Sequence, residues 1–179
     1  RWRSDGYVPN YAKVPDVLWA AHSRKNIRSI EKHGLLSNPG VLSAYETTSE
    51  VVRQMKEALA RGELPPVAKL KIDFMEKQMG HTYGWGTKDA AHAFGWRSSW
   101  SEMFSRNLKI PKMDVSQLFQ VVKFKNRGKW EPDSLDPTYK DAWRSKQDVR
   151  PEDILSIDPI DDVLAQEAIK RDPLIAGAL

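Results

Sequence analysis

Two separated segments of this chain share one local pattern, and that pattern limits the fold more than any other feature. Residues 18–35 read LWAAHSRKNIRSIEKHGL, and residues 82–94 read TYGWGTKDAAHAF. In each segment a short strand-like run delivers polar or aromatic residues, and a run with helical spacing follows it. We therefore expect one domain of the α+β class, in which two strand–turn–helix units build a single ligand cleft.

The remaining elements predict helices early in the chain and strands at its beginning, middle and end. Gly34 is placed to end the first helix, Thr47–Ser49 to cap the second, and Thr87 to begin the fourth. The predicted helices cover residues 26–33, 49–61, 66–79, 88–95 (or on towards 104) and 161–171. The predicted strands cover 17–21, 117–124, 143–149 and 154–157, and a further short strand ends at 83. A loop is predicted over 131–141. We expect an N-terminal tail over 1–16, a folded domain over 17–160, and a C-terminal helix and tail over 161–179.

Composition excludes several kinds of site. The chain has no cysteine, which excludes disulfides, thiolate zinc sites and cysteine nucleophiles. The histidines at 22, 33, 81 and 92 lack metal-ligand spacing, so we expect no metal. No phosphate-cradling glycine–lysine loop and no GxSxG motif occur. No apolar run approaches the roughly 20 residues that cross a bilayer, so we expect no membrane association.

The first segment resembles the first motif of the ADP-ribosyltransferases. In that motif a His or Arg that grips the NAD ribose lies on a strand, followed by Asn, by Ile four residues later, and by Gly-Leu. The same spacing is kept here by Asn26, Ile30, Gly34 and Leu35. The ungapped register, however, places Ala20 where the gripping residue belongs.

His22 is the candidate for that missing contact. Side chains two apart on a strand project from the same face, so His22 can reach the cleft that position 20 would face. The resemblance then implies that His22 binds the ribose, with Ser23 and Arg24 near the pyrophosphate. The alternative is that this is only a helix N-terminus, with Ser23 as the N-cap.

The second segment resembles the second motif of the same family. The resemblance implies that Tyr83 stacks on the nicotinamide, and that Gly84, Trp85 and Thr87 line the NAD site. A further glycine, Gly86, would also let the backbone approach the ligand. The alternatives are a glycine-rich turn with a core tyrosine, or Tyr45 as the stacking residue, with Thr47-Thr48-Ser49 after it.

The third motif of the family is a glutamate at the start of a late strand, about seven residues before a Val. Val149 supplies that later landmark, and counting back places Ala142 at the catalytic position. Alanine cannot stabilise the positive charge that develops on the sugar as nicotinamide leaves. Three explanations stay open: an inactivating Glu→Ala change, a shifted register that uses Asp141 or Gln147, or a domain that only binds.

Basic residues alternate after the strand predicted over 117–124. Lys123, Lys125, Arg127 and Lys129 would line one face and could bind nucleic acid or another partner, consistent with a formal net charge of +4. The alternative is a solvated edge that discourages strand pairing.

Taken together, the resemblance covers residues 17–160 and implies a split mixed β-sheet with a central NAD cleft. It implies transfer of ADP-ribose from NAD to a protein or nucleic-acid target with release of nicotinamide. By analogy we expect a cytoplasmic toxin or phage-defence effector with a neutralising antitoxin or immunity protein. Two alternatives remain: an RNA 2′-phosphotransferase-like enzyme, for which Arg24, Arg144 and Arg150 are candidates, and a catalytically dead binding or structural module with a basic face.

Overall fold

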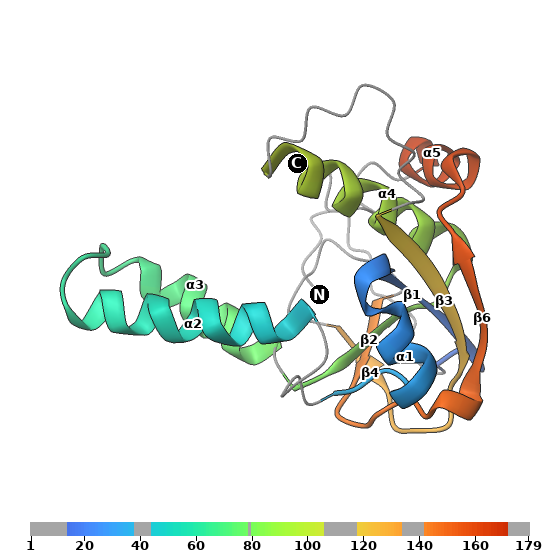
Figure 1. Cartoon of the computed structure of the whole chain (residues 1–179), viewed down its shortest axis with the longest axis horizontal. Coiled ribbons are helices and arrows are strands. Elements are labelled where there is room, and N and C mark those ends of the chain that lie inside the picture. The colour runs from blue at the N-terminus through green and yellow to red at the C-terminus, as the bar shows by residue number, and fades with distance from the viewer. Residues whose placement is uncertain (1–13, 38–43, 79, 106–117, 134–141, 172–179) are drawn as a thin grey trace, which may run out of the picture.

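The computed structural model describes residues 14–37, 44–78, 80–105, 118–133 and 142–171 (Figure 1). Five α-helices, six strands and two short 3-10 helices lie in these ranges. The helices are η1 (Arg24–Asn26), α1 (Ile27–His33), α2 (Ala44–Ala60), α3 (Ala68–Gln78), α4 (Lys88–Ser105), η3 (Pro151–Asp153) and α5 (Asp162–Arg171). The strands are β1 (Val17–Ser23), β2 (Thr82–Trp85), β3 (Phe119–Lys125), β4 (Glu131–Pro132), β5 (Ala142–Ser145) and β6 (Ile154–Pro159).

The strands form one open sheet in the order β4-β5-β2-β1-β3-β6. This arrangement of a sheet with separate helices confirms the α+β class. The expectation of a mixed sheet is wrong for the described strands, because all five pairings between them are antiparallel.

The sheet is nearly divided between β1 and β2. Seven residue pairs join β1 to β3, whereas the single pair Trp19↔Trp85 joins β1 to β2. The strands β4, β5 and β2 thus form one part of the sheet and β1, β3 and β6 the other, and the two parts meet at this tryptophan pair.

Each face of the sheet carries its own hydrophobic cluster. On one face, Trp85, Val121 and Ala142 pack with the alanines of α4 and with Ala168 of α5. On the other, Leu18, Ala20 and Phe124 pack beneath α1 with its buried Ile30, together with Leu35 and Val149. The helix predicted over 161–171 therefore belongs to the core of the domain, since Ala165 and Ala168 of α5 are fully buried.

Helices α2 and α3 form a hairpin that projects from the body of the molecule (Figure 1). At its tip, Val67 and Leu70 are 66% and 71% exposed. Within the residues that the structure describes, no helix is both long and apolar enough to cross a membrane.

The predicted helices and strands within the described residues are confirmed as helices and strands. The residues at which they begin and end differ from the predictions. Helix α2 begins at Ala44, so the prediction that Thr47–Ser49 caps it is wrong: these residues lie inside the helix. The strand predicted over 143–149 ends at Ser145, because the Ser145 hydroxyl donates to the carbonyl of Lys129 and accepts the N–H of Gln147. Within the loop predicted over 131–141, the first two residues form β4.

Candidate functional site

The three motif segments come together in the sheet, although the first begins at Leu18 and the third at Ala142, more than 120 residues later. The first contains β1, the second β2 and the third begins with β5, and these three strands are neighbours. Trp85 of β2 lies opposite Trp19 of β1 and opposite Ala142 of β5. Trp85, the last residue of β2, therefore lies directly beside Ala142, the position at which the resemblance implies a glutamate.

Next to the register partners Trp19, Trp85 and Ala142, a parallel row of side chains crosses β2, β5 and β4. Tyr83 and Glu131 are both register partners of Arg144, and because facing partners share a side, the three project from the face that carries Trp85 and Ala142. The Arg144 Nε donates to the Glu131 carboxylate at 2.8 Å. Its Nη1, by contrast, is buried and has no hydrogen-bond partner in the described residues.

Within the described residues, this guanidinium nitrogen is one of several buried polar atoms without a hydrogen-bond partner. Buried N–H groups in folded proteins nearly always have a partner, so an exception calls for an explanation such as a bound group. Arginine presents its donors in a planar fork that suits phosphates and carboxylates. Sequence reasoning named Arg144 only for the phosphotransferase alternative, and it missed Glu131, because the pairing of β4, β5 and β2 is not visible in local sequence.

Ala142 lies in the core cluster beneath α4 and is only 6% exposed. Of the two residues that a shifted register would use, Gln147 lies in the turn after β5, where its side chain is exposed and accepts the N–H of Lys129. This places it beyond the row of Tyr83 and Arg144. Asp141 lies outside the described residues.

His22 is placed away from Tyr83. Its register partner is Gln120 of β3, and alternation along β1 puts it on the face of Leu18 and Ala20 rather than on that of Trp19. The structure thus brings Tyr83 and position 142 together on one face and leaves His22 on the other. Ser23 occupies the N-cap position of η1 but makes no capping bond through its hydroxyl.

The environment of His22 has a consequence for stability. Desolvation lowers the pKa of His22 to about 4, so its imidazole is neutral at pH 7. Between about pH 6.5 and pH 4 the unfolded chain takes up a proton at this site and the folded chain does not, so stability is lost as the pH falls through this window. A shift of this size corresponds to about 3 kcal/mol, and because His22 is half-buried we expect about 1–2 kcal/mol.

Urea denaturation at pH 7.0, 5.5 and 4.5 measures this loss. We expect His22→Gln to reduce the slope of stability against pH, with the residual slope in part due to His92, whose pKa burial also lowers. An exposed histidine replaced in the same way, His33→Gln, serves as the control. Equal slopes for the wild type and His22→Gln would contradict the attribution of this pH dependence to His22.

The other residues predicted to line the NAD site lie in β2 and in the connection from β2 to α4. A Cβ on Gly84 would lie 3.1 Å from both Leu18 and Phe124, so this glycine allows close packing of β2 on the second cluster. Trp85 is buried, with its ring 5.7 Å from that of Phe94. Gly86 and Thr87 connect β2 to α4, and the carbonyl of Thr87 accepts the N–H of Ala91, as expected at the start of this helix.

The residues of the predicted basic face lie on β3 and in the turn that follows it. Lys123 lies opposite Trp19 and Lys125 opposite Val17, whereas Arg127 binds the buried carboxylate of Asp153 at 2.6 Å.

The arginines proposed for the phosphotransferase alternative are not gathered in one place. The backbone N–H of Arg24 binds the carbonyl of Leu118, just before β3. Arg150 lies 3.8 Å from the Asp153 carboxylate, to which Arg127 binds just after the same strand. Arg24 and Arg150 are therefore at opposite ends of β3.

Within the described ranges no group of three or more His, Asp or Glu side chains is placed to hold a metal ion. Comparison of the chain with family models, with curated proteins and with solved structures finds no match.

Proposed function

We propose that this chain is the NAD-binding core of an ADP-ribosyltransferase and that it lacks the carboxylate that such an enzyme places at position 142. One observation carries the proposal: three short motifs, recognised separately along the sequence, lie on adjacent strands, with Trp85 next to Ala142 and Tyr83 next to Arg144. A chance resemblance gives no reason for the three segments to be neighbours.

Two side chains of this face, Tyr83 and Arg144, are the ones we assign to the dinucleotide. Tyr83 is half-buried and offers a ring for stacking. The guanidinium of Arg144, whose Nη1 has no hydrogen-bond partner among the described residues, offers a donor for a phosphate or ribose oxygen. In the reaction the bond between the nicotinamide nitrogen and the ribose breaks, nicotinamide leaves, and an acceptor on a macromolecule forms the new bond to the sugar. We assign His22, on the other face, no part in these contacts.

Binding of NAD tests this proposal without requiring turnover. At a hundredfold excess over its dissociation constant, NAD would stabilise the fold by about 2.7 kcal/mol, which raises the Tm by about 5–10 °C. We expect Tyr83→Leu to weaken binding by about 3- to 10-fold and Tyr83→Phe, which keeps the ring, to bind like the wild type. Calorimetric titration measures the affinities, and an unchanged Tm in millimolar NAD overturns the proposal.

A second candidate, the RNA 2′-phosphotransferase-like enzyme, has one observation in its favour: the buried Arg144 Nη1 also suits an RNA phosphate. The separation of Arg24 from Arg150 counts against it. An RNA oligonucleotide that carries a 2′-phosphate distinguishes the two, because only a phosphotransferase would move that phosphate from the RNA to NAD.

A further inference from the structure

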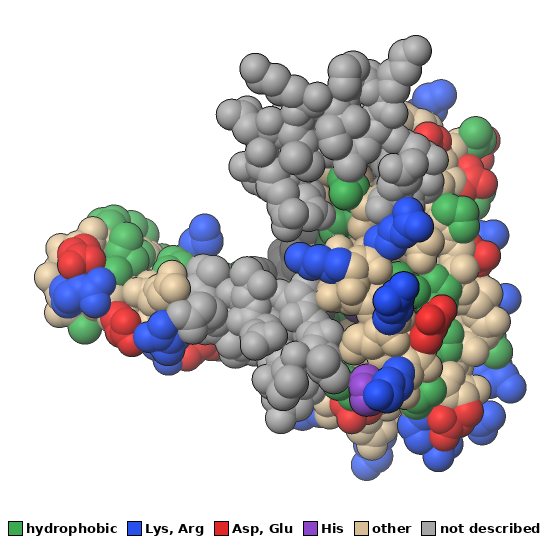
Figure 2. Space-filling view, in the orientation of Figure 1, with side chains coloured by type: hydrophobic (Ala, Val, Ile, Leu, Met, Phe, Trp, Pro, Cys, Tyr) green, Lys and Arg blue, Asp and Glu red, His purple; other side chains and the backbone are tan. Residues whose placement is uncertain are grey.

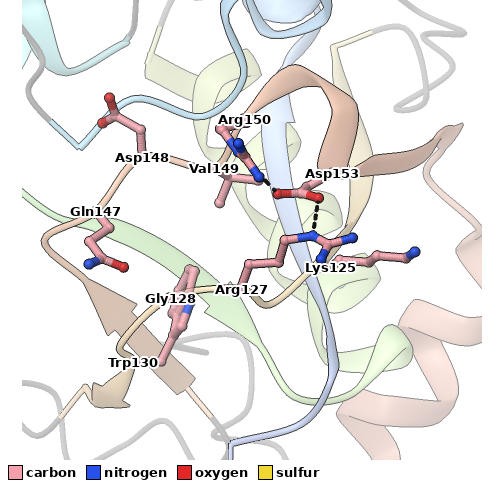
Figure 3. A pocket seen from close by; sticks show the side chains of 9 residues that line it. All are labelled: Lys125, Arg127, Gly128, Trp130, Gln147, Asp148, Val149, Arg150 and Asp153. Carbon is pink, nitrogen blue, oxygen red and sulfur yellow. Dashed lines mark hydrogen bonds and ion pairs between the residues drawn. The ribbon is translucent and has the colours of Figure 1, made fainter.

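A pair of adjoining hollows opens at the end of the sheet where β3 turns into β4. The first has a volume of about 230 Å³ and the second about 460 Å³. They share two side chains, Trp130 and Gln147. Figure 3 shows the first hollow, with Trp130 and Gln147 towards one end and Arg127, Asp153 and Lys125 towards the other.

Positive charge dominates the lining of both hollows. Six cationic and three anionic side chains line them, an excess of three charges compared with four for the whole chain. The three anionic groups are already engaged: Asp153 with Arg127, Glu131 with Arg144, and Asp148 with the N–H and hydroxyl of Ser37. The lysines that line the hollows, Lys125, Lys129 and Lys146, are exposed and make no ion pair within the described residues.

The aromatic ring between the hollows is held in place. Trp130 packs against Phe124, with the ring centroids 5.6 Å apart, and it is half-buried. Since it also lines both hollows, its remaining surface is available to a ligand that passes from one to the other. A rigid aromatic surface flanked by cations on both sides is the arrangement that binds single-stranded nucleic acid, in which bases stack and phosphates meet lysines.

The positive surface continues onto the neighbouring helix. Leu35, just after α1, bridges Val149, which lines the first hollow. Figure 2 shows Lys and Arg side chains gathered over α1, and the exposed cations there are Arg24, Lys25, Arg28 and Lys32. A chain of phosphates leaving the first hollow would therefore find further positive charge along this helix.

We propose that the two hollows around Trp130 bind a single-stranded nucleic acid, with a base stacked on Trp130 and the flanking phosphates near Lys129 and Lys146 on one side and Lys125 on the other. Single strands are favoured over duplexes, because a base must be unstacked to reach a ring inside a hollow. They are favoured over acidic proteins, because an acidic peptide would use the lysines but has no base to stack on the tryptophan. If the proposed function holds, the bound strand would be its acceptor, and that extension rests on the proposed function.

The test uses the full chain without NAD, so failure of the NAD proposal leaves it unaffected. Fluorescence anisotropy with labelled 20-nucleotide oligo(dT) and oligo(U) measures binding at several salt concentrations. We expect the double variant Lys129→Glu and Lys146→Glu to lose at least about 10-fold in affinity. It should also lower the slope of log affinity against log salt by about 1.4, because two phosphate contacts are removed. Lys71→Glu, an exposed lysine of α3 in the projecting hairpin, makes the same kind of charge reversal away from the hollows and should bind like the wild type.

The aromatic contact has its own variants. Trp130→Leu should weaken binding by about 5- to 100-fold, and Trp130→Phe should recover most of it, because phenylalanine keeps both a stacking surface and the contact with Phe124. Circular dichroism checks that each variant is folded. If Trp130→Leu is not folded, Trp130→Phe and the lysine variants still test whether the hollows bind the oligonucleotides. Heparin, poly-glutamate and duplex DNA are the competing ligands. The proposal is overturned if the wild type binds neither oligonucleotide at 50 mM salt, if the double variant binds unchanged, or if any competing ligand binds as tightly with the same dependence on Trp130.

Discussion

Replacing Gly34 with alanine is expected to lower the free energy of unfolding by about 3–5 kcal/mol. Gly34 has φ 77° and ψ −163°, a backbone conformation essentially reserved for glycine, which costs another residue about 1–3 kcal/mol. A Cβ at this position would lie 1.8 Å from the carbonyl oxygen of Val149 and 2.9 Å from its carbon. These are backbone atoms and cannot rotate away, so the two segments must separate.

That separation would also break the two hydrogen bonds between Leu35 and Val149, from Leu35 N–H to the Val149 carbonyl at 2.9 Å and from Val149 N–H to the Leu35 carbonyl at 2.8 Å. Each contributes about 1 kcal/mol. Chemical denaturation followed by circular dichroism measures the loss. Gly62 is the matched control, since it has φ 75° and nothing within 4 Å of the methyl group that alanine would add, so Gly62→Ala should cost only about 1–2 kcal/mol. Equal costs at the two positions would show that the contact with Val149 is unimportant.

Gly34 illustrates which parts of the fold local sequence can predict. Its place after a run with helical spacing predicts a helix end, and α1 does end there, with the Gly34 N–H bound to the carbonyl of Ile30. The second requirement, that Val149 passes close enough to exclude any side chain, depends on a residue more than 100 positions later. Sequence periodicity reports the helix and carries no information on that approach.

The site shows the same division between local and distant information. The sequence predicts a strand that ends at Tyr83 and another over 143–149, and the structure pairs β2 with β5 at these places. The partner of Tyr83 across the sheet, Arg144, and the glutamate that binds Arg144 depend on the register of three strands, which no local pattern fixes. Side chains two apart share a face, so the sequence predicts that His22 enters the cleft with position 20. The pairing of Trp19 with Trp85 instead puts Ala20 and His22 on the opposite face from Tyr83.

The two hollows could not be predicted either. Trp130 follows a turn and has no periodic neighbours to mark it as a ligand contact. It becomes a candidate only because β3, β4 and the turn after β5 meet around it, which brings Lys125 and Lys146 to either side of one ring.

Ala142→Glu is expected to give the largest functional change, a rise of at least about 100-fold in the rate of nicotinamide release from NAD. A carboxylate beside the ribose stabilises the positive charge that forms as nicotinamide leaves, and removal of one such electrostatic group from an enzyme typically costs about 100- to 1000-fold. The neutral isostere Ala142→Gln is the control for packing, and it should release nicotinamide no faster than the wild type. Chromatographic detection of free nicotinamide measures all three proteins.

The same substitution places a charge where the chain now packs an alanine, and the neighbouring arginine decides whether that is tolerated. Position 142 is 6% exposed, so an unpaired carboxylate there would have a raised pKa and would destabilise the fold. Arg144 projects from the same face two residues away, and its buried Nη1, which has no hydrogen-bond partner in the described part of the chain, can pair with the new carboxylate. We therefore expect Ala142→Glu to fold, and Ala142→Glu combined with Arg144→Gln to be less stable than the two single changes predict.

Gln147→Glu completes the experiment, because it places a carboxylate at the exposed position that a shifted register would use. If position 142 is the catalytic position, Gln147→Glu releases no more nicotinamide than the wild type. Activity from Gln147→Glu but not from Ala142→Glu would move the catalytic position to the turn after β5. A folded Ala142→Glu protein that binds NAD and leaves it intact would contradict ADP-ribose transfer, because the dinucleotide, the ring of Tyr83 and the missing charge would then all be present without reaction.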